Sequence, residues 1–218
     1  MTRGMGILRV TEIYKSVQGE SSWAGRPCTF VRLTGCPLRC RWCDTAYAFK
    51  GGSDLSLEDI LAQVKALGVP LVELTGGEPL AQKASCELVD LLLAEGFEVL
   101  IETSGSESLR GVPRKAHLIM DIKCPGSGMH EKMDWNNLSY LKQQDEIKFV
   151  VADRADFDWA LACIQDQNLY DVCSILFSPA WGLVSPKDLV AWMLESGVKS
   201  RLNLQLHKYI WGPKTKGV

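Results

Sequence analysis

Short apolar runs recur at fairly regular intervals along the chain, and Gly, Pro, Asn or Asp residues bound most of them. They are rich in Val, Ile, Leu and Phe, as expected for strands of a buried sheet. The pattern predicts strands at residues 29–33, 71–75, 98–103, 118–123, 146–151, 174–178 and 201–206.

Helical periodicity fills several of the gaps between these strands. From Leu57 to Leu67 apolar residues recur every three or four positions, with Ser56 placed to cap the helix and Gly68 to end it. The same pattern predicts helices within residues 82–96, 155–168 and 185–197, the last with Pro186 at the first helical position.

This alternation of strands and helices predicts right-handed βα units and a parallel sheet. Periodicity alone leaves two architectures open, a doubly wound open sheet and an incomplete barrel. No linker-like segment divides the chain, so residues 1–218 are predicted to form one domain. Both architectures place ligands at the carboxyl ends of the strands, in the loops that follow them.

Composition narrows the classes of function. The net charge is −2 at pH 7, which gives no general attraction to nucleic acid or to an anionic membrane, so we expect a small-molecule substrate. No apolar run has the length of a signal-peptide core or a membrane span, so we expect a cytoplasmic protein. Thiols stay reduced there, and clustered cysteines then indicate metal or redox chemistry.

Three of the eight cysteines, Cys36, Cys40 and Cys43, form a C-x3-C-x2-C cluster directly after a predicted strand. A structural zinc site is the first alternative, but such sites use four ligands, and no second Cys pair or His pair follows. A [4Fe–4S] cluster fits better, because three thiolates leave one iron open to an outside ligand. Such an iron can chelate the amino and carboxylate groups of S-adenosylmethionine and reduce its sulfonium, chemistry that the cofactor carries.

A glycine-rich segment, "LTGGEPL" at residues 74–80, follows the next predicted strand. Gly76 and Gly77 allow backbone carbonyls to approach an ammonium group closely, and Glu78 adds an anion. Together with the cysteine loop, this segment resembles the radical S-adenosylmethionine (SAM) superfamily. Three segments, at residues 16–21, 30–45 and 75–79, resemble more narrowly the 7-carboxy-7-deazaguanine synthase family within it.

The resemblance implies a fold and an activity. The fold is an α/β one, an incomplete, distorted (β/α)6-type partial barrel. The activity is that of a carbon–nitrogen lyase of queuosine and 7-deazapurine biosynthesis, a pathway that supplies a tRNA modification precursor. It contracts the ring of 6-carboxy-5,6,7,8-tetrahydropterin to 7-carboxy-7-deazaguanine with loss of ammonia. The deoxyadenosyl radical is the reagent, so no side chain is assigned a catalytic role.

The resemblance also implies which residues bind what. The cofactors are a [4Fe–4S] cluster on Cys36, Cys40 and Cys43, S-adenosylmethionine, and Mg2+ on Thr45; a helix cap is the other interpretation of Thr45. The implied S-adenosylmethionine contacts are Trp42, Cys43, Asp44, Gly77, Glu78, Ser104, Lys123, Cys124 and Pro125. The implied substrate contacts are Val17, Gln18, Gly19, Arg32 and Thr75, with Arg32 suited to clasp the substrate carboxylate.

The implied partners are a flavodoxin-type or other electron donor and a second copy of the chain in a homodimer. Two other functions share the cysteine loop. One is a radical SAM activase of a glycyl-radical enzyme, which the segments "SVQGE" and "CDT" disfavour. The other is a non-catalytic, cluster-binding redox sensor, which leaves the "TGGEP" segment unexplained.

Overall fold

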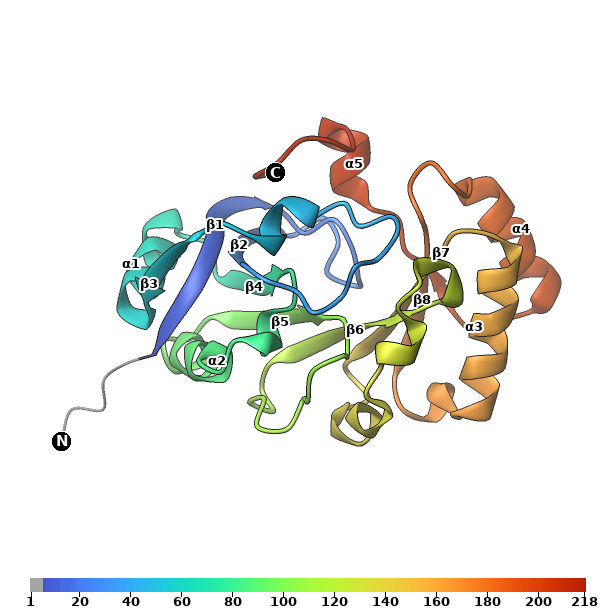
Figure 1. Ribbon diagram of the computed structural model, residues 1–218, viewed down its shortest axis with the longest axis horizontal. Helices are drawn as coiled ribbons and strands as arrows, with labels where there is room; N and C mark the ends of the chain where they lie inside the picture. Colours follow the sequence, from blue (N-terminus) through green and yellow to red (C-terminus); the bar gives the residue numbers. More distant parts are fainter. Residues whose placement is uncertain (1–5) are drawn as a thin grey trace.

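A nine-stranded sheet runs through the computed structural model, which describes residues 6–218 (Figure 1). The strand order is β3-β1-β2-β4-β5-β6-β7-β8-β9. All neighbours from β2 to β9 are parallel, and β1 is antiparallel to both β2 and β3. The strands are β1 (Ile7–Val17), β2 (Pro27–Leu33), β3 (Ser53–Ser56), β4 (Leu71–Gly76), β5 (Glu98–Thr103), β6 (His117–Lys123), β7 (Glu146–Val151), β8 (Ser174–Pro179) and β9 (Arg201–Leu202).

Helices α1 and α4 begin at the residues that the sequence marks, and α5 was not predicted. Ser56 accepts a hydrogen bond from the backbone N–H of Asp59 at 3.1 Å, and Gly68 ends the helix with a φ of 67°. Ser185 caps α4 in the same way, with Pro186 as its first residue. The four predicted helices are confirmed, and the helices are α1 (Leu57–Leu67), α2 (Ser85–Ala94), α3 (Arg154–Asp166), α4 (Pro186–Ser196) and α5 (Leu206–Trp211).

The predicted fold class is confirmed, because the sheet stays open and unclosed (Figure 1). Several elements differ from the expectation. β1 and β3 were not predicted, and residues 104–116 join β5 to β6 without an α-helix. The strand predicted at 201–206 covers only Arg201–Leu202, because the backbone N–H of Leu206 turns away to donate to Gly19 O at 2.8 Å. None of the helices among residues 6–218 has the length and apolarity needed to cross a membrane.

Strand residues alternate between two faces of the sheet. The outer face packs against the helices in one apolar core, where the rings of Phe157 and Phe177 lie 4.9 Å apart. The inner face carries a smaller apolar cluster that includes Phe30, Leu100 and Ile119. Farther along the same strands, towards their carboxyl ends, the inner positions become polar, and this change places the site.

Candidate active site

A cavity of about 360 Å³ lies at the carboxyl edge of the sheet, a volume suited to a small molecule. Because side chains alternate along a strand, the positions on one face of a strand lie two residues apart. Strands β2, β4, β5, β6 and β7 contribute polar residues to the cavity wall from such positions: Arg32, Glu73, Thr75, Glu102, Asp121, Lys123 and Lys148. Thr103, at the end of β5, also lines the cavity.

The three cysteines of the loop after β2 all line this cavity. They are free thiols of intermediate exposure, and burial raises the pKa of each. Among residues 6–218, no three Cys, His, Asp or Glu side chains converge as the ligands of a single metal ion do. A [4Fe–4S] cluster fits this arrangement, since each thiolate then binds a different iron and iron binding deprotonates it.

The glycine pair after β4 packs against the cysteine loop, backbone to backbone. A Cβ on Gly77 would lie 2.1 Å from Gly35 O, and one on Gly76 would lie 2.2 Å from Leu33 O. The backbone N–H of Glu78 donates to Gly35 O at 2.8 Å. The two glycines therefore allow the loops after β2 and β4 to form one continuous rim.

Glu78 extends this rim to the next strand. Its side chain is fully buried and accepts hydrogen bonds from Ser104 N at 2.7 Å and Thr103 Oγ1 at 2.9 Å. Burial raises the pKa of this carboxyl, although these hydrogen bonds oppose the shift. The carboxylate thus joins the loops after β4 and β5 and holds Ser104 beside the cavity.

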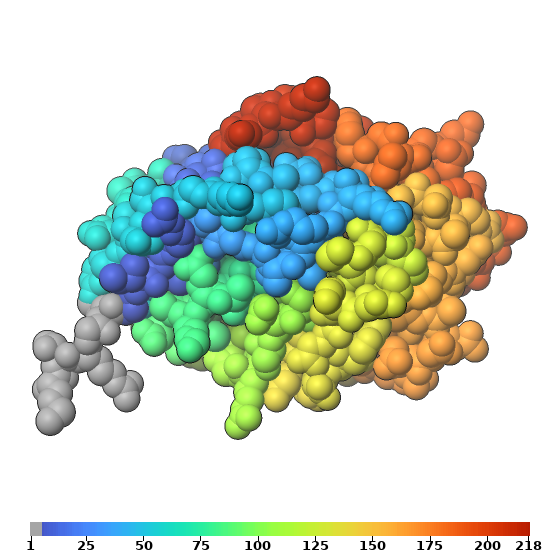
Figure 2. Space-filling view, viewed as in Figure 1, coloured from blue at the N-terminus to red at the C-terminus, as the bar shows by residue number. Residues whose placement is uncertain are grey.

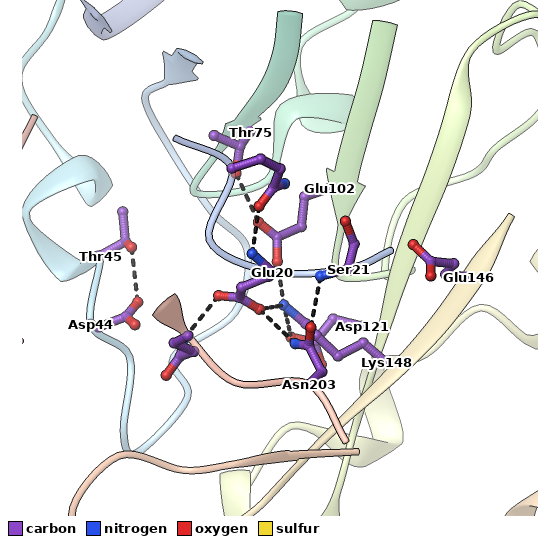
Figure 3. Close-up of polar contacts among 12 residues, drawn as sticks. Glu20, Ser21, Asp44, Thr45, Thr75, Glu102, Asp121, Glu146, Lys148 and Asn203 are labelled. Carbon is purple, nitrogen blue, oxygen red and sulfur yellow. Dashed lines mark hydrogen bonds and ion pairs between the residues drawn. The ribbon is translucent and has the colours of Figure 1, made fainter. Parts of the chain in front are cut away.

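The loop between β1 and β2, residues 18–26, borders the cavity through Gln18, Gly19 and Glu20, and we call it the floor loop. Gln18 contacts Glu73 of β4, and its Oε1 accepts from Glu20 N at 2.6 Å. Ser21 N donates to Asn203 Oδ1 at 2.7 Å (Figure 3). These contacts tie the floor loop to the sheet and to the segment after β9.

Lys148 is only 3% exposed, and carboxylates from three elements lie near its ammonium (Figure 3). Its Nζ lies 2.7 Å from Glu20 Oε2, contacts Glu102, and lies 3.8 Å from Asp121 Oδ2. Burial raises the pKa of Glu20, but the charges of Lys148 and His207 and the hydrogen bonds from Lys148 and Gln205 together lower the value to about 2. Lys123 Nζ also lies 2.8 Å from Asp121 Oδ2, so three carboxylates face two ammonium groups and this wall carries a net negative charge.

Arg32 lies on another wall of the same cavity. Its Nε donates to Glu12 Oε1 at 2.8 Å, and its Nη2 donates to the Tyr14 hydroxyl at 2.7 Å. These two partners and the nearby ring of Tyr47 fix the plane of the guanidinium. The cavity thus combines a positioned cation with an anionic wall, an arrangement that orients a ligand carrying a carboxylate at one end.

Thr45 takes the N-cap position of a short 3-10 helix (Ala46–Phe49), but its side chain makes no capping bond. Its hydroxyl instead donates to Asp44 Oδ1 at 2.9 Å, and both residues line the cavity (Figure 3). Burial raises the pKa of Asp44, but the charge and hydrogen bond of Lys208, with the hydrogen bond from Thr45 and the charge of Lys148, together lower the value to about 2.

The chain's last residues lie across the mouth of the cavity. Pro213, Thr215, Gly217 and Val218 line it, and the Lys216 ammonium lies 4.5 Å from the centre of the Tyr47 ring. Figure 2 shows this C-terminal segment (red) at the top of the view, beside N-terminal segments (blue).

Most of the predicted site residues meet in this cavity. Those that line it are Val17, Gln18, Gly19, Arg32, Cys36, Cys40, Trp42, Cys43, Asp44, Thr45, Thr75, Gly77, Ser104 and Lys123. Three predicted residues lie behind its wall: Glu78 and Cys124 are fully buried, and Pro125 begins a 3-10 helix. Sequence reasoning missed Glu73, Glu102, Asp121 and Lys148, whose only signal is a charged residue within an apolar strand.

The cysteine loop on an open α/β sheet is the arrangement of a radical SAM protein, and residues 30–125 match the model of the Radical SAM superfamily. The 7-carboxy-7-deazaguanine synthase of Koribacter versatilis is 47% identical over 97% of this chain and 100% of its own length. That of Chlorobaculum tepidum is 42% identical, with 97% of each sequence covered. The chain therefore belongs to the 7-carboxy-7-deazaguanine synthase family of the radical SAM superfamily. Membership of the superfamily implies a [4Fe–4S] cluster and S-adenosylmethionine as cofactors.

Solved structures share the fold. QueE from Escherichia coli matches with a TM-score of 0.76 at 24% identity, over 92% of this chain and 95% of its own. SuiB from Streptococcus suis, solved bound to S-adenosylmethionine, matches with a TM-score of 0.52 at 12% identity, over 78% of this chain and 44% of its own.

Proposed function

We propose that the chain is a carbon–nitrogen lyase that converts 6-carboxy-5,6,7,8-tetrahydropterin into 7-carboxy-7-deazaguanine with loss of ammonia. The observation that carries the proposal is the convergence of three free thiols, a glycine rim and a positioned guanidinium on one cavity. Relatives with this name align over nearly the whole chain. We propose further that residues 1–218 form a single radical SAM domain.

The cofactor side of the cavity comprises the cysteine loop and the glycine rim. When bound, the cluster and S-adenosylmethionine would supply the radical chemistry of the reaction. Cys36, Cys40 and Cys43 would hold the cluster, and Trp42 would shield it from water. The implied S-adenosylmethionine contacts lie along the same rim, with Glu78, Cys124 and Pro125 supporting it from behind.

The substrate side comprises the strand ends and the floor loop. Arg32, fixed by Glu12 and Tyr14, receives the substrate carboxylate. The anionic wall at Glu102 and Asp121 suits the N–H donors of an aminopyrimidinone ring. Val17, Gln18, Gly19 and Thr75 border the same space.

Thr45 is the proposed ligand of Mg2+. Because its hydroxyl donates to Asp44, the oxygen's lone pairs remain available, and oxygen is the donor that Mg2+ prefers. Substrate and water would complete the coordination. The proposal also includes a cytoplasmic location, a flavodoxin-type or other electron donor, and a homodimer.

The test is anaerobic incubation of the reconstituted protein with S-adenosylmethionine, a strong reductant, Mg2+ and the carboxytetrahydropterin. Formation of 7-carboxy-7-deazaguanine, followed by chromatography and mass, supports the proposal. Alanine variants of Cys36, Cys40 and Cys43 are the matched controls, and each is expected to form no product. A reconstituted cluster without product, or product formation by a cysteine variant, refutes it.

A further inference from the structure

Lys208 of α5 lies close to the candidate metal site. Only 7% of it is exposed, and lysine is rarely buried to this extent without a partner. Its ammonium contacts Asp44 Oδ2 and donates to Gln205 Oε1 at 2.7 Å. The sequence pattern gives this residue no role.

The two oxygens of Asp44 connect Lys208 to Thr45. Oδ2 pairs with the ammonium of Lys208, and Oδ1 accepts the hydroxyl hydrogen of Thr45 at 2.9 Å. A threonine hydroxyl has one hydrogen and two lone pairs, so fixing the O–H bond also fixes the direction of the lone pairs. The state of Asp44 therefore decides how Thr45 presents its oxygen.

Lys208 is itself held in place. Gln205 uses its Nε2 to donate to Glu20 Oε1 at 2.9 Å, and Leu206 N donates to Gly19 O at 2.8 Å. The start of α5 is thereby anchored to the floor loop. The ammonium approaches Asp44 from a fixed element and not from a free chain end.

We propose that Lys208 is a positioning residue for the Thr45 hydroxyl. It engages one oxygen of Asp44, so that this carboxylate accepts from Thr45 with the other and keeps the lone pairs of the hydroxyl in one fixed direction. The inference rests on the proposed function, since it takes Thr45 as the ligand of Mg2+. Partners that orient a ligand in this way are worth about 10- to 100-fold in metal affinity.

The experiment measures cation binding without turnover. The reconstituted enzyme is incubated with S-adenosylmethionine and the carboxytetrahydropterin but no reductant, and Mn2+ is titrated as the probe by electron paramagnetic resonance. We expect Lys208→Met to raise the half-saturating Mn2+ concentration by about tenfold or more, with iron content unchanged. Lys214→Met, an exposed lysine farther along the C-terminal segment, is the matched control and is expected to bind as the parent does.

A double-mutant cycle tests whether Lys208 acts through Asp44. Asp44→Asn keeps an oxygen acceptor for Thr45 but removes the charge that Lys208 pairs with, so it is expected to weaken Mn2+ binding. Combined with Lys208→Met it is expected to add little, because two residues acting through one contact are not additive. Independent, additive losses would overturn the proposal.

Thr45→Ala distinguishes a wrong metal assignment from a wrong role for Lys208. If Thr45→Ala binds Mn2+ as the parent does, the metal assignment in the proposed function is wrong and this inference falls with it. If Thr45→Ala weakens binding but Lys208→Met matches Lys214→Met, the role of Lys208 alone is wrong. If Lys208→Met loses iron or helix content, the Mn2+ affinity of Asp44→Asn is measured in its place. Unchanged Mn2+ affinity in Asp44→Asn overturns the proposal.

Discussion

Gly77 shows how a single hydrogen in place of a side chain shapes the site. A Cβ at this position would lie 2.1 Å from Gly35 O and 2.9 Å from Cys36 Cβ, so Gly77→Ala must displace the cysteine loop. We expect this variant to hold less iron after reconstitution and to lose activity in proportion. Iron and sulfide assays per chain measure the effect, and parent-like iron content and turnover would show that the loop tolerates the displacement.

The environment of Glu73 leads us to predict a pH dependence of the free energy of unfolding. Burial raises its pKa well above the ordinary value of 4.5, and the neighbouring Glu102 and Glu20 raise it further, opposed by Lys148 and Arg32. Above pH 4.5 the unfolded chain releases this proton while the folded chain retains it. The free energy of unfolding that this site contributes therefore falls as pH rises towards the raised pKa.

Glu73→Gln keeps the shape of this side chain without a titrating proton. We expect its stability relative to the parent to increase as pH rises above about 4.5, measured by urea unfolding over a pH series. A stability difference that stays constant with pH would contradict the neutral, buried state of Glu73.

Sequence reasoning recovered the residues that lie in contiguous motifs and missed those that do not. Cys36, Cys40, Cys43 and the "TGGEP" segment carry their chemistry in local spacing. Lys148 and Asp121 lie in apolar strands, and they become neighbours only through the pairing of β6 with β7. Whether a charged strand residue faces solvent or a cavity depends on the curvature of the sheet, which local patterns do not encode.

At the scale of elements, the floor loop and the first turn of α5 depend on each other. A Cβ on Gly19 would lie 2.3 Å from His207 Nδ1 and 3.0 Å from His207 N. Gly19→Ala therefore separates the two segments while leaving the cysteine loop untouched. We expect an increased KM for the carboxytetrahydropterin with parent-like iron content, measured by steady-state kinetics and iron assay. A reduced iron content with unchanged KM would contradict the assignment of the floor loop to the substrate side of the cavity and not to the cofactor side.

Elements with a local sequence signal were predicted, and elements that depend on distant contacts were missed. Helices α1 and α4 were predicted with their caps, because capping depends on residues adjacent in sequence. β3 pairs only with β1 and was missed, and β1, which pairs with both β2 and β3, has an irregular register between Val10 and Glu12. The shortness of β9 was also missed, since a contact with Gly19, far away in sequence, redirects the chain there.

At the scale of the whole molecule, the large apolar core lies on the outer face of the open sheet, and the cavity lies on the inner face. Helices α1 to α4 pack against the outer face, and on the inner face of β2, β4, β5 and β6 apolar residues give way to polar ones towards the carboxyl end. The open edge leaves room for a cofactor and a substrate side by side. The account requires that three protein thiolates leave one iron of a cluster free for S-adenosylmethionine.

The most direct test of that claim is the electron paramagnetic resonance spectrum of the reduced, reconstituted protein with and without S-adenosylmethionine. The account predicts a [4Fe–4S] signal that changes when S-adenosylmethionine is added, because its amino and carboxylate groups bind the open iron. A signal that S-adenosylmethionine leaves unchanged, or a loop that binds a single zinc ion with side chains alone, would contradict it.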